Sequence, residues 1–293
     1  MHDSDAICRS VEDLFLNAFD MELSLPTGRR FNGYKDSSVI RWAGHDETTN
    51  GKAHAGFVAW GGNANKFGNE TLCVHLTGQG CESINMLNSL SDCDLWEVTA
   101  DVISQHDAKI TRLDLAYDDL EGEFGGVGAA VGWYKSGAFC SGGRMPSVKQ
   151  VGDWITGESR TFYIGKAENG KMMRIYEKGH QMGDLESPWV RYEVQIGSKD
   201  REIPVTALMF RDAYMAGTYP AMKFILKVAP VSIPTVVKKR LKVTLDKLTV
   251  CASVSYGKLI NALTGVGMSA SEVVETLRRD GLPSRMFVPP SAC

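Results

Sequence analysis

The stretch Arg112-Leu-Asp-Leu-Ala-Tyr-Asp118 places ionisable and apolar side chains in alternation. Successive side chains of a β-strand point to opposite faces of a sheet, so this pattern predicts a strand with a polar face and an apolar face. Two later stretches follow the same pattern: Met172-Met-Arg-Ile-Tyr-Glu-Lys178 and Trp189-Val-Arg-Tyr-Glu-Val-Gln195. Charged groups gathered on one face are costly to bury unless they pair or hold a ligand. We therefore expect the functional residues on this polar face.

The predicted polar face collects side chains from all three stretches: Arg112, Asp114, Asp118, Arg174, Tyr176, Lys178, Arg191, Glu193 and Gln195. Each one alone has a simpler interpretation. A charged strand residue often only forms a cross-strand ion pair, and Tyr176 alone reads as a half-buried strand aromatic. Three further tyrosines compete with it for a chemical role: Tyr117, Tyr163 and Tyr192. The coincidence of three such strands favours a site.

Length and composition indicate a folded protein with a full hydrophobic core. The chain has 293 residues, 43% of them hydrophobic, enough for one large domain with an appendage or for two modest domains. Its seven cysteines include no C-x-x-C pair, and its acidic start carries no signal peptide. These features favour a reduced cytoplasmic protein over a disulfide framework or a zinc knuckle. No apolar stretch is long enough to span a bilayer, so we expect no membrane partner.

Charge is distributed unevenly along the chain. The net charge is −3, but the residues from 221 onward hold eleven basic and four acidic side chains, a difference of +7 that leaves −10 on the first 220. A basic tail on an acidic body suggests contact with a polyanion, nucleic acid first among them. A solvated helix face is an equally good interpretation of the charge alone.

The pattern of elements predicts an α+β fold. Short strand-like runs occupy residues 21–25, 55–60, 71–76, 110–117, 160–164, 171–177 and 189–196. Helices are predicted over residues 94–106, 202–213, 241–248, 255–263 and 269–280. We expect a domain over residues 1–218 with a mainly antiparallel sheet and flanking helices. A small basic helical segment should follow over residues 219–293.

Residues 160–178 read as a β-hairpin, because their Asn169-Gly170 pair is a strong hairpin signal. The order of three motifs then resembles the replication initiation factor family: Arg112–Asp118, Tyr163-Ile-Gly-Lys with Arg174-Ile-Tyr-Glu-Lys, and Arg191-Tyr-Glu. That family includes replication initiators of filamentous phages and is similar to the Rep proteins of staphylococcal rolling-circle plasmids. Gly33-Tyr34 and Leu76-Thr-Gly-Gln-Gly-Cys81 resemble the phage branch, and the likeness runs from about Gly33 to Ile196.

The resemblance implies a rolling-circle DNA replication initiator in a bacterial host cell, with residues 1–218 as the nicking domain. In such a reaction a tyrosine attacks a phosphodiester of the origin, stays joined to the 5′ phosphate and frees a 3′ hydroxyl for the host polymerase. Carried over onto this chain, Tyr176 is the nucleophile and Asp114 and Glu193 match the acidic positions, with Asp118 a weaker match. Origin DNA, double- and single-stranded, is the expected partner. Host helicase and a second copy of the chain are further candidates.

The chemistry of the residues agrees with these roles. A phenol has a pKa of about 10, so Tyr176 needs a nearby cation or a base, and Arg174 and Lys178 are predicted to flank it. Arg112 belongs to the same predicted catalytic group. Mg²⁺ or Mn²⁺ held by carboxylates would neutralise the scissile phosphate. The predicted metal ligands are Asp114, Glu193 and Asp118, although about 13 Å of strand between the two aspartates suits Asp118 better to a supporting role.

The histidines of the chain limit which metal ligands and which bases the site can use. None of the six histidines forms the His-x-His pair that holds the metal in the best known nicking enzymes, so oxygen ligands should dominate. His180 follows Tyr176 closely and is a candidate proton acceptor or a solvated loop residue. Two other functions stay open: a non-catalytic DNA-binding regulator, and a metal nuclease in which water attacks. The basic tail is expected to hold duplex DNA or to mediate self-association.

Overall fold

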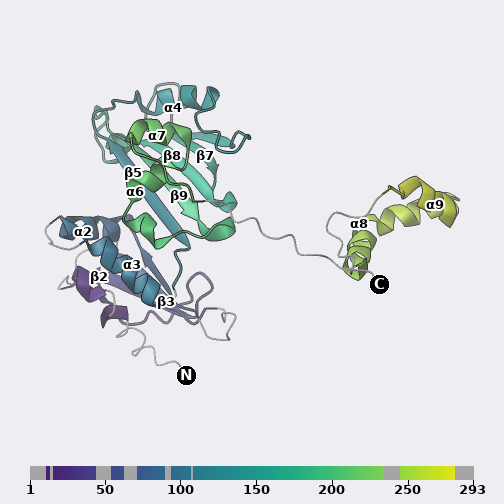
Figure 1. Cartoon of the computed structure of the whole chain (residues 1–293), viewed down its shortest axis with the longest axis horizontal. Coiled ribbons are helices and arrows are strands. Elements are labelled where there is room, and N and C mark those ends of the chain that lie inside the picture. Colours follow the sequence, from purple (N-terminus) through teal and green to yellow (C-terminus); the bar gives the residue numbers. More distant parts are fainter. Residues whose placement is uncertain are drawn as a thin grey trace, which may run out of the picture. The chain divides into compact units, whose positions relative to one another are not determined.

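The computed structural model describes residues 11–13, 16–43, 54–62, 71–89, 94–106, 108–233 and 245–280. These residues form two antiparallel sheets with flanking helices, which confirms the expected α+β class (Figure 1). The chain divides into two compact units, Met1–Thr235 and Val236–Cys293. Both sheets belong to the first unit.

The first sheet joins four strands in chain order: β1 (Met21–Leu23), β2 (Asp36–Trp42), β3 (Gly56–Trp60) and β4 (Cys73–Leu76). Helices α2 (Gly78–Asn88) and α3 (Leu95–Gln105) and the 3₁₀ helix η1 (Leu16–Phe19) pack on it. The side chains of Thr77 and Asp94 cap the two α-helices by accepting hydrogen bonds from backbone N–H groups of their first turns. The helix predicted over residues 94–106 is thus confirmed.

The second sheet has five strands in the order β5-β9-β8-β7-β6. Their bounds are β5 (Arg112–Asp119), β6 (Val148–Val151), β7 (Thr161–Lys166), β8 (Lys171–Glu177) and β9 (Val190–Gly197). The predicted hairpin is confirmed: β7 and β8 pair antiparallel across a single 3₁₀ turn, η2 (Ala167–Asn169), which ends on Gly170 at φ +78°. Strand β9 lies between β5 and β8, so all three sequence stretches of the polar face are neighbours.

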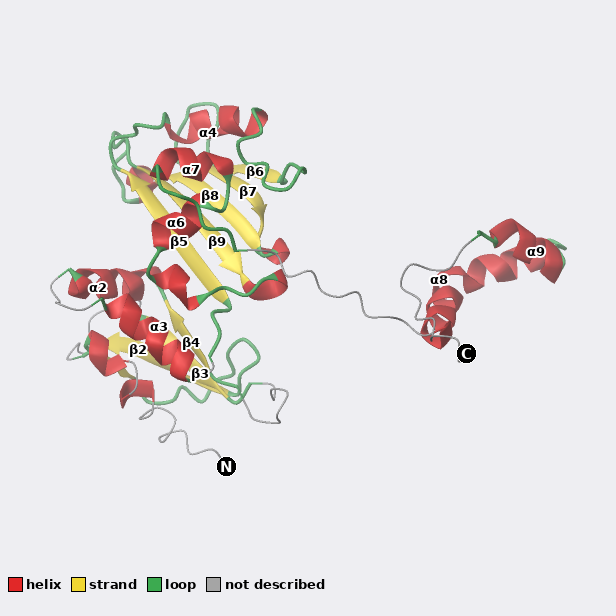
Figure 2. Cartoon of the chain, viewed as in Figure 1, coloured by secondary structure: helices red, strands yellow, loops and turns green. Residues whose placement is uncertain are grey.

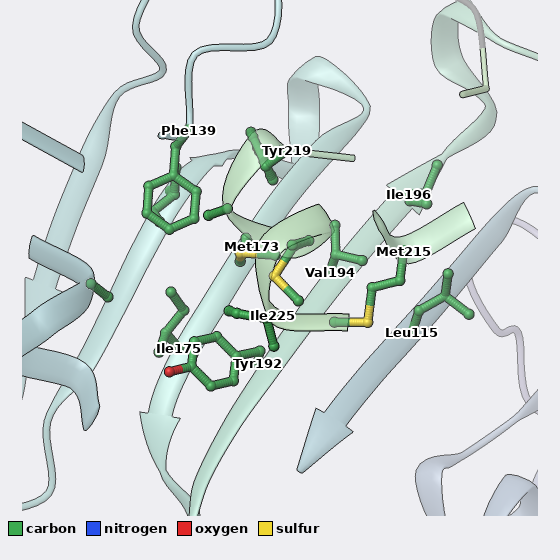
Figure 3. Packing of buried hydrophobic residues seen from close by; sticks show 14 of the residues in the cluster. Leu115, Phe139, Met173, Ile175, Tyr192, Val194, Ile196, Met215, Tyr219 and Ile225 are labelled. Carbon is green, nitrogen blue, oxygen red and sulfur yellow. The ribbon is translucent and has the colours of Figure 1, made fainter. Parts of the chain in front are cut away.

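Helices cover the apolar face of this second sheet. They are α4 (Gly126–Lys135), α6 (Arg211–Ala216) and α7 (Pro220–Leu226), and Figure 2 shows α6 and α7 in front of the strands. The core beneath them takes side chains from both layers, among them Ile175, Tyr192 and Val194 of the strands and Met215 and Ile225 of the helices (Figure 3). The alternation predicted for β5, β8 and β9 therefore buries one face and leaves the other partly exposed.

The structure differs from the sequence-based elements in two respects. The helix predicted over residues 202–213 is wrong: the structure has a 3₁₀ helix η4 (Val205–Leu208) and then α6. The backbone is extended at Pro204 and leaves the helical conformation again at Phe210. Strands β2 and β6 and helices α2, α4 and α7 were not predicted from the sequence. Short elements complete the first unit: α5 (Lys178–Gln181) and η3 (Ser198–Asp200).

The second unit contains α8 (Leu245–Gly265) and α9 (Ala270–Leu277). Helix α8 replaces the two helices predicted within residues 241–263, of which residues 241–244 lie outside the described residues. The capping box from Ser269 to Glu272 is present and opens α9. Helix α7 packs through Ala221, Met222 and Ile225 into the core of the first unit, so that unit extends beyond residue 219, where the basic segment was expected to begin. No helix in the described ranges is long and apolar enough to cross a bilayer.

Candidate active site

The polar face of the second sheet is organised in two rows that cross its strands. In the first row the paired residues are Ala116, Glu193, Arg174, Tyr163 and Lys149. In the second they are Asp118, Arg191, Tyr176, Thr161 and Val151. Side chains at paired positions of an antiparallel sheet lie on the same face with Cβ atoms about 5 Å apart, so each row is a line of direct contacts. Tyr176 therefore has Arg191 beside it and Glu193 diagonally across.

The hydroxyl of Tyr176 is held by a carboxylate. It donates a hydrogen bond of 3.2 Å to Oε2 of Glu193. Burial raises the pKa of Tyr176, and the charge of Glu193 raises it further, while the charge of Arg191 and its hydrogen bond to the phenol oppose the rise. The proton of this phenol thus points at a group able to accept it, and a cation lies beside the oxygen that would be left.

Arg191 is the cation at Tyr176, and Asp118 fixes its position. Asp118 accepts two hydrogen bonds of 2.7 Å from Nε and Nη2 of Arg191, a bidentate arrangement, and a third of 2.6 Å from the indole of Trp189. Sequence reasoning placed Arg191 on the polar face but gave it no role. The signal was present, because Arg191 precedes Glu193 by two residues and must share its face.

Arg174 lies between two carboxylates. Its Nη2 forms an ion pair with Oε1 of Glu193 and lies 3.8 Å from Oδ2 of Asp114. Nε and Nη2 of Arg112 donate to the two carboxylate oxygens of Asp114, at 2.9 and 2.5 Å, and this bidentate contact raises the pKa of Arg112. Two cations and two anions form one cluster, with the Glu193 carboxylate bridging the cluster and Tyr176.

Lys178 and His180 lie away from this cluster. The strand pleat that would place Lys178 beside Tyr176 ends at Glu177, and Lys178 begins α5, where its ammonium donates to Gln181 at 3.0 Å. His180 accepts a hydrogen bond from the backbone of Ser159 and lies 3.4 Å from the carboxylate of Glu177. Glu177 is buried and projects from the face opposite to Tyr176. His180, which contacts Glu177, therefore has no contact with the Tyr176 hydroxyl among those described.

Of the competing tyrosines, only Tyr163 shares a face with Tyr176. Tyr117 and Tyr192 project into the helix-covered core, with ring centroids 6.4 Å apart. Burial raises the pKa of Tyr192 strongly, and its hydroxyl has no hydrogen-bond partner among the described residues. A buried phenol of this kind is unsuited to attack a phosphate.

The predicted metal ligands separate into a pair and a single residue. Asp114 and Glu193 both direct a carboxylate oxygen at Nη2 of Arg174, whereas Asp118 faces Arg191 in the next row. Over the described residues, no three side chains of His, Cys, Asp and Glu gather closely enough to hold one ion. Mg²⁺ takes oxygen ligands and often uses only one or two carboxylates together with substrate phosphates. Asp114 and Glu193 are the two predicted ligands that direct oxygens at a common point, and in this structure Nη2 of Arg174 lies at that point.

Comparison with known proteins agrees with the class of protein that this sheet and its polar face suggest. The family model described as "Replication initiation factor" matches residues 108–277, more than half of the chain. The chain therefore belongs to the replication initiation factor family. The matched region contains all of the second sheet and helices α8 and α9.

Among solved structures, one similar protein is the rolling circle replication initiator protein from Geobacillus stearothermophilus. It is 27% identical to this chain, with a TM-score of 0.45, and the match covers 64% of each chain. The match therefore spans slightly less than two thirds of that protein. No curated protein matches this chain.

Proposed function

We propose that this member of the family starts rolling-circle replication by nicking and rejoining origin DNA, with Tyr176 as the nucleophile. The observation that carries the proposal is the hydrogen bond from the Tyr176 hydroxyl to Glu193, beside an arginine that Asp118 holds in place. A nucleophilic hydroxyl needs an adjacent base or a cation that stabilises its anion, and Tyr176 has both.

The chemical step follows from this geometry. The Tyr176 oxygen attacks the scissile phosphorus while its proton passes to Oε2 of Glu193. The bond from phosphorus to the 3′ oxygen breaks, and the leaving oxygen takes up a proton as a 3′ hydroxyl. The tyrosine remains joined to the 5′ phosphate. Rejoining is the reverse, in which a 3′ hydroxyl attacks the phosphotyrosine and the phenol recovers its proton.

The neighbouring residues take supporting roles in the proposal. Arg191 stabilises the phenolate that forms, Asp118 orients Arg191, and Arg112 orients Asp114. Arg174, between two carboxylates, is placed to contact a phosphate oxygen once DNA is bound. Mg²⁺ or Mn²⁺, held by Asp114 and Glu193, would neutralise charge on the scissile phosphate. Lys178, at the start of α5, is proposed to contact the DNA backbone rather than the phenol.

The proposed partners follow from the reaction. They are origin DNA in double- and single-stranded form, with the host polymerase extending the 3′ end and a host helicase opening the duplex. The basic second unit stays a candidate either for holding duplex DNA or for self-association.

A nicking assay separates this proposal from its two alternatives. The substrate is a supercoiled plasmid carrying the origin of the element that encodes the chain, incubated with Mg²⁺. Tyr176→Phe is compared with Tyr163→Phe, a matched control on the same sheet face. We expect nicking by the wild type and by Tyr163→Phe and none by Tyr176→Phe. Nicking that survives in Tyr176→Phe would indicate a water-attacking nuclease, and binding without nicking by the wild type would indicate a regulator.

A further inference from the structure

A polar hollow lies at the turn of the β7–β8 hairpin. Its volume is about 190 Å³. Lys171, at the start of β8, lines it and lies five strand residues, or about 16 Å, from Tyr176. Lys171 alternates with Met173 and Ile175, which belong to the helix-covered core, whereas Tyr176 projects from the opposite face. The hollow is therefore separate from the nicking site.

Four cations from three separate segments line this hollow. Lys166 and Lys171 come from the hairpin, Arg144 from the loop before β6, and Arg201 from the segment after β9. None of the described residues that line it is acidic, although the first 220 residues of the chain carry a net charge of −10. Ser141, Ser147 and Asn169 add neutral hydrogen-bonding groups. A concentration of positive charge on an acidic body is a feature of anion sites.

The half-buried ammonium of Lys171 has neutral partners where a carboxylate would be the ordinary one. It donates to Ser141 Oγ at 3.0 Å and to the Thr218 carbonyl at 2.5 Å, and it lies 3.9 Å from the ring centroid of Tyr219. Burial, together with the charge of Arg201, lowers its pKa to about 8. An ammonium has three donors, so one remains beyond these two hydrogen bonds. A bound anion would supply the opposite charge that offsets the cost of partly burying this cation.

Gly165, which lines the hollow, and Gly170, which lies beside Arg201, leave no room for a side chain. Gly165 has φ +82°, and a Cβ there would lie 2.7 Å from the Lys171 carbonyl oxygen and 3.4 Å from the Tyr219 hydroxyl. Gly170 has φ +78°, and a Cβ there would lie 3.1 Å from Nη1 of Arg201, the nitrogen that donates to the Gly170 carbonyl. Any larger residue would be strained at both positions, and at Gly170 it would also crowd the guanidinium of Arg201.

We propose that this hollow, between Arg144, Lys171 and Arg201, binds a phosphate group. Its volume is smaller than the 300–1,000 Å³ or so of sites that enclose a whole small molecule, so it suits the phosphate of a larger ligand. That chemistry is shared by a backbone phosphate of DNA and the terminal phosphate of a nucleotide. Binding here does not depend on Tyr176, and the inference stands apart from the nicking reaction.

Thermal unfolding of the full chain tests phosphate binding directly. The unfolding temperature is measured in sodium phosphate and in sodium chloride at equal ionic strength, because a ligand of the folded state raises it. The variants are Arg144→Ala, whose side chain is exposed, and Lys171→Gln, with Lys135→Ala on α4 as an exposed control. We expect phosphate to raise the unfolding temperature of the wild type and the control, and the rise to be lost in both variants. An equal rise in all four proteins, or none in the wild type, overturns the proposal.

The source of the phosphate is found by fluorescence anisotropy with a labelled single-stranded oligonucleotide and a labelled mononucleotide. If the site takes DNA backbone, Arg144→Ala weakens oligonucleotide binding several-fold and lowers the salt slope by about one. If it takes a nucleotide, the same variant weakens only the mononucleotide. Either loss supports the site. Binding of both probes that is unchanged in Arg144→Ala and Lys171→Gln contradicts it.

Discussion

Asp118 and Arg191 face each other across β5 and β9, joined by two hydrogen bonds of 2.7 Å. Because Asp118 holds Arg191 in this position, Arg191 is the cation that lies beside Tyr176. The sequence suggested Arg174 and Lys178 for that position, but Arg174 pairs with Glu193 and Lys178 begins α5. The electrostatics of the phenol therefore depend on a residue that belongs to neither flank of Tyr176 in the chain.

Asp118→Asn tests whether the pair acts through Tyr176. Asparagine keeps the size of the side chain but loses the charge that orients Arg191, so the cation beside the phenol loosens and the pKa of Tyr176 rises. We expect nicking to slow by about tenfold near neutral pH, the scale of one charged hydrogen bond, and the loss to shrink at alkaline pH. The measurement is the pH dependence of the single-turnover nicking rate. A loss of equal size at every pH would assign Asp118 a purely structural role.

The metal dependence distinguishes the carboxylates from one another. Asp114 and Glu193 both direct an oxygen at Nη2 of Arg174, whereas Asp118 pairs with Arg191. We expect a chelator to abolish nicking, and Asp114→Asn to raise the Mg²⁺ concentration needed for half-maximal rate. In Asp118→Asn that concentration should stay near the wild-type value although the rate falls. An equal shift in both variants would instead support all three acids as ligands.

Stability should depend on pH through Lys171. Its folded pKa of about 8 lies below the 10.5 of an exposed lysine, so between these values the unfolded chain binds a proton that the folded chain has lost. Stability contributed by this residue therefore rises with pH across that window. Relative to Lys171→Met, the wild type should gain on the order of 2 kcal/mol between pH 8 and 10, measured by urea unfolding. A constant difference between the two proteins would refute the shift.

Tyr192 offers a contrast between polar and apolar burial in the core. Its ring packs against Trp133 at 6.3 Å, but its hydroxyl has no hydrogen-bond partner among the described residues. We expect Tyr192→Phe to change the free energy of unfolding by less than about 1 kcal/mol or to stabilise the protein, because no hydrogen bond is lost. Ile175→Ala in the same core should cost about 2–5 kcal/mol. Urea unfolding measures both, and a large loss in Tyr192→Phe would reveal a hidden partner.

The polar face was predictable from the sequence because side-chain alternation in β5, β8 and β9 is a local property. The strand order was not, since it depends on which distant strands pair. For that reason Asp118 could be placed on the correct face without its partner Arg191 being known. The role of a residue such as Arg191 depends on which residues it faces on the neighbouring strands, and only the pairing register of the structure gives those.

The missed elements lacked a local signal as well. Helix α4 contains Gly126, Gly128 and Gly132, which weaken helix propensity, and it is stabilised by packing Val127 and Ala130 onto the sheet. Strand β6 is exposed along its whole length, so no alternation marks it. In both cases tertiary contacts or sheet pairing determine the structure that composition alone does not indicate.

The most direct test of the central claim is a map of the covalent linkage after reaction with a labelled origin oligonucleotide. Trypsin cleaves after Arg174 and Lys178, so a linkage at Tyr176 is carried by the peptide of residues 175–178. We predict that mass spectrometry finds the 5′ phosphate on this peptide and that Tyr176→Phe removes it. A linkage on the peptide that contains Tyr163, or nicked DNA without any linked peptide, would contradict the account.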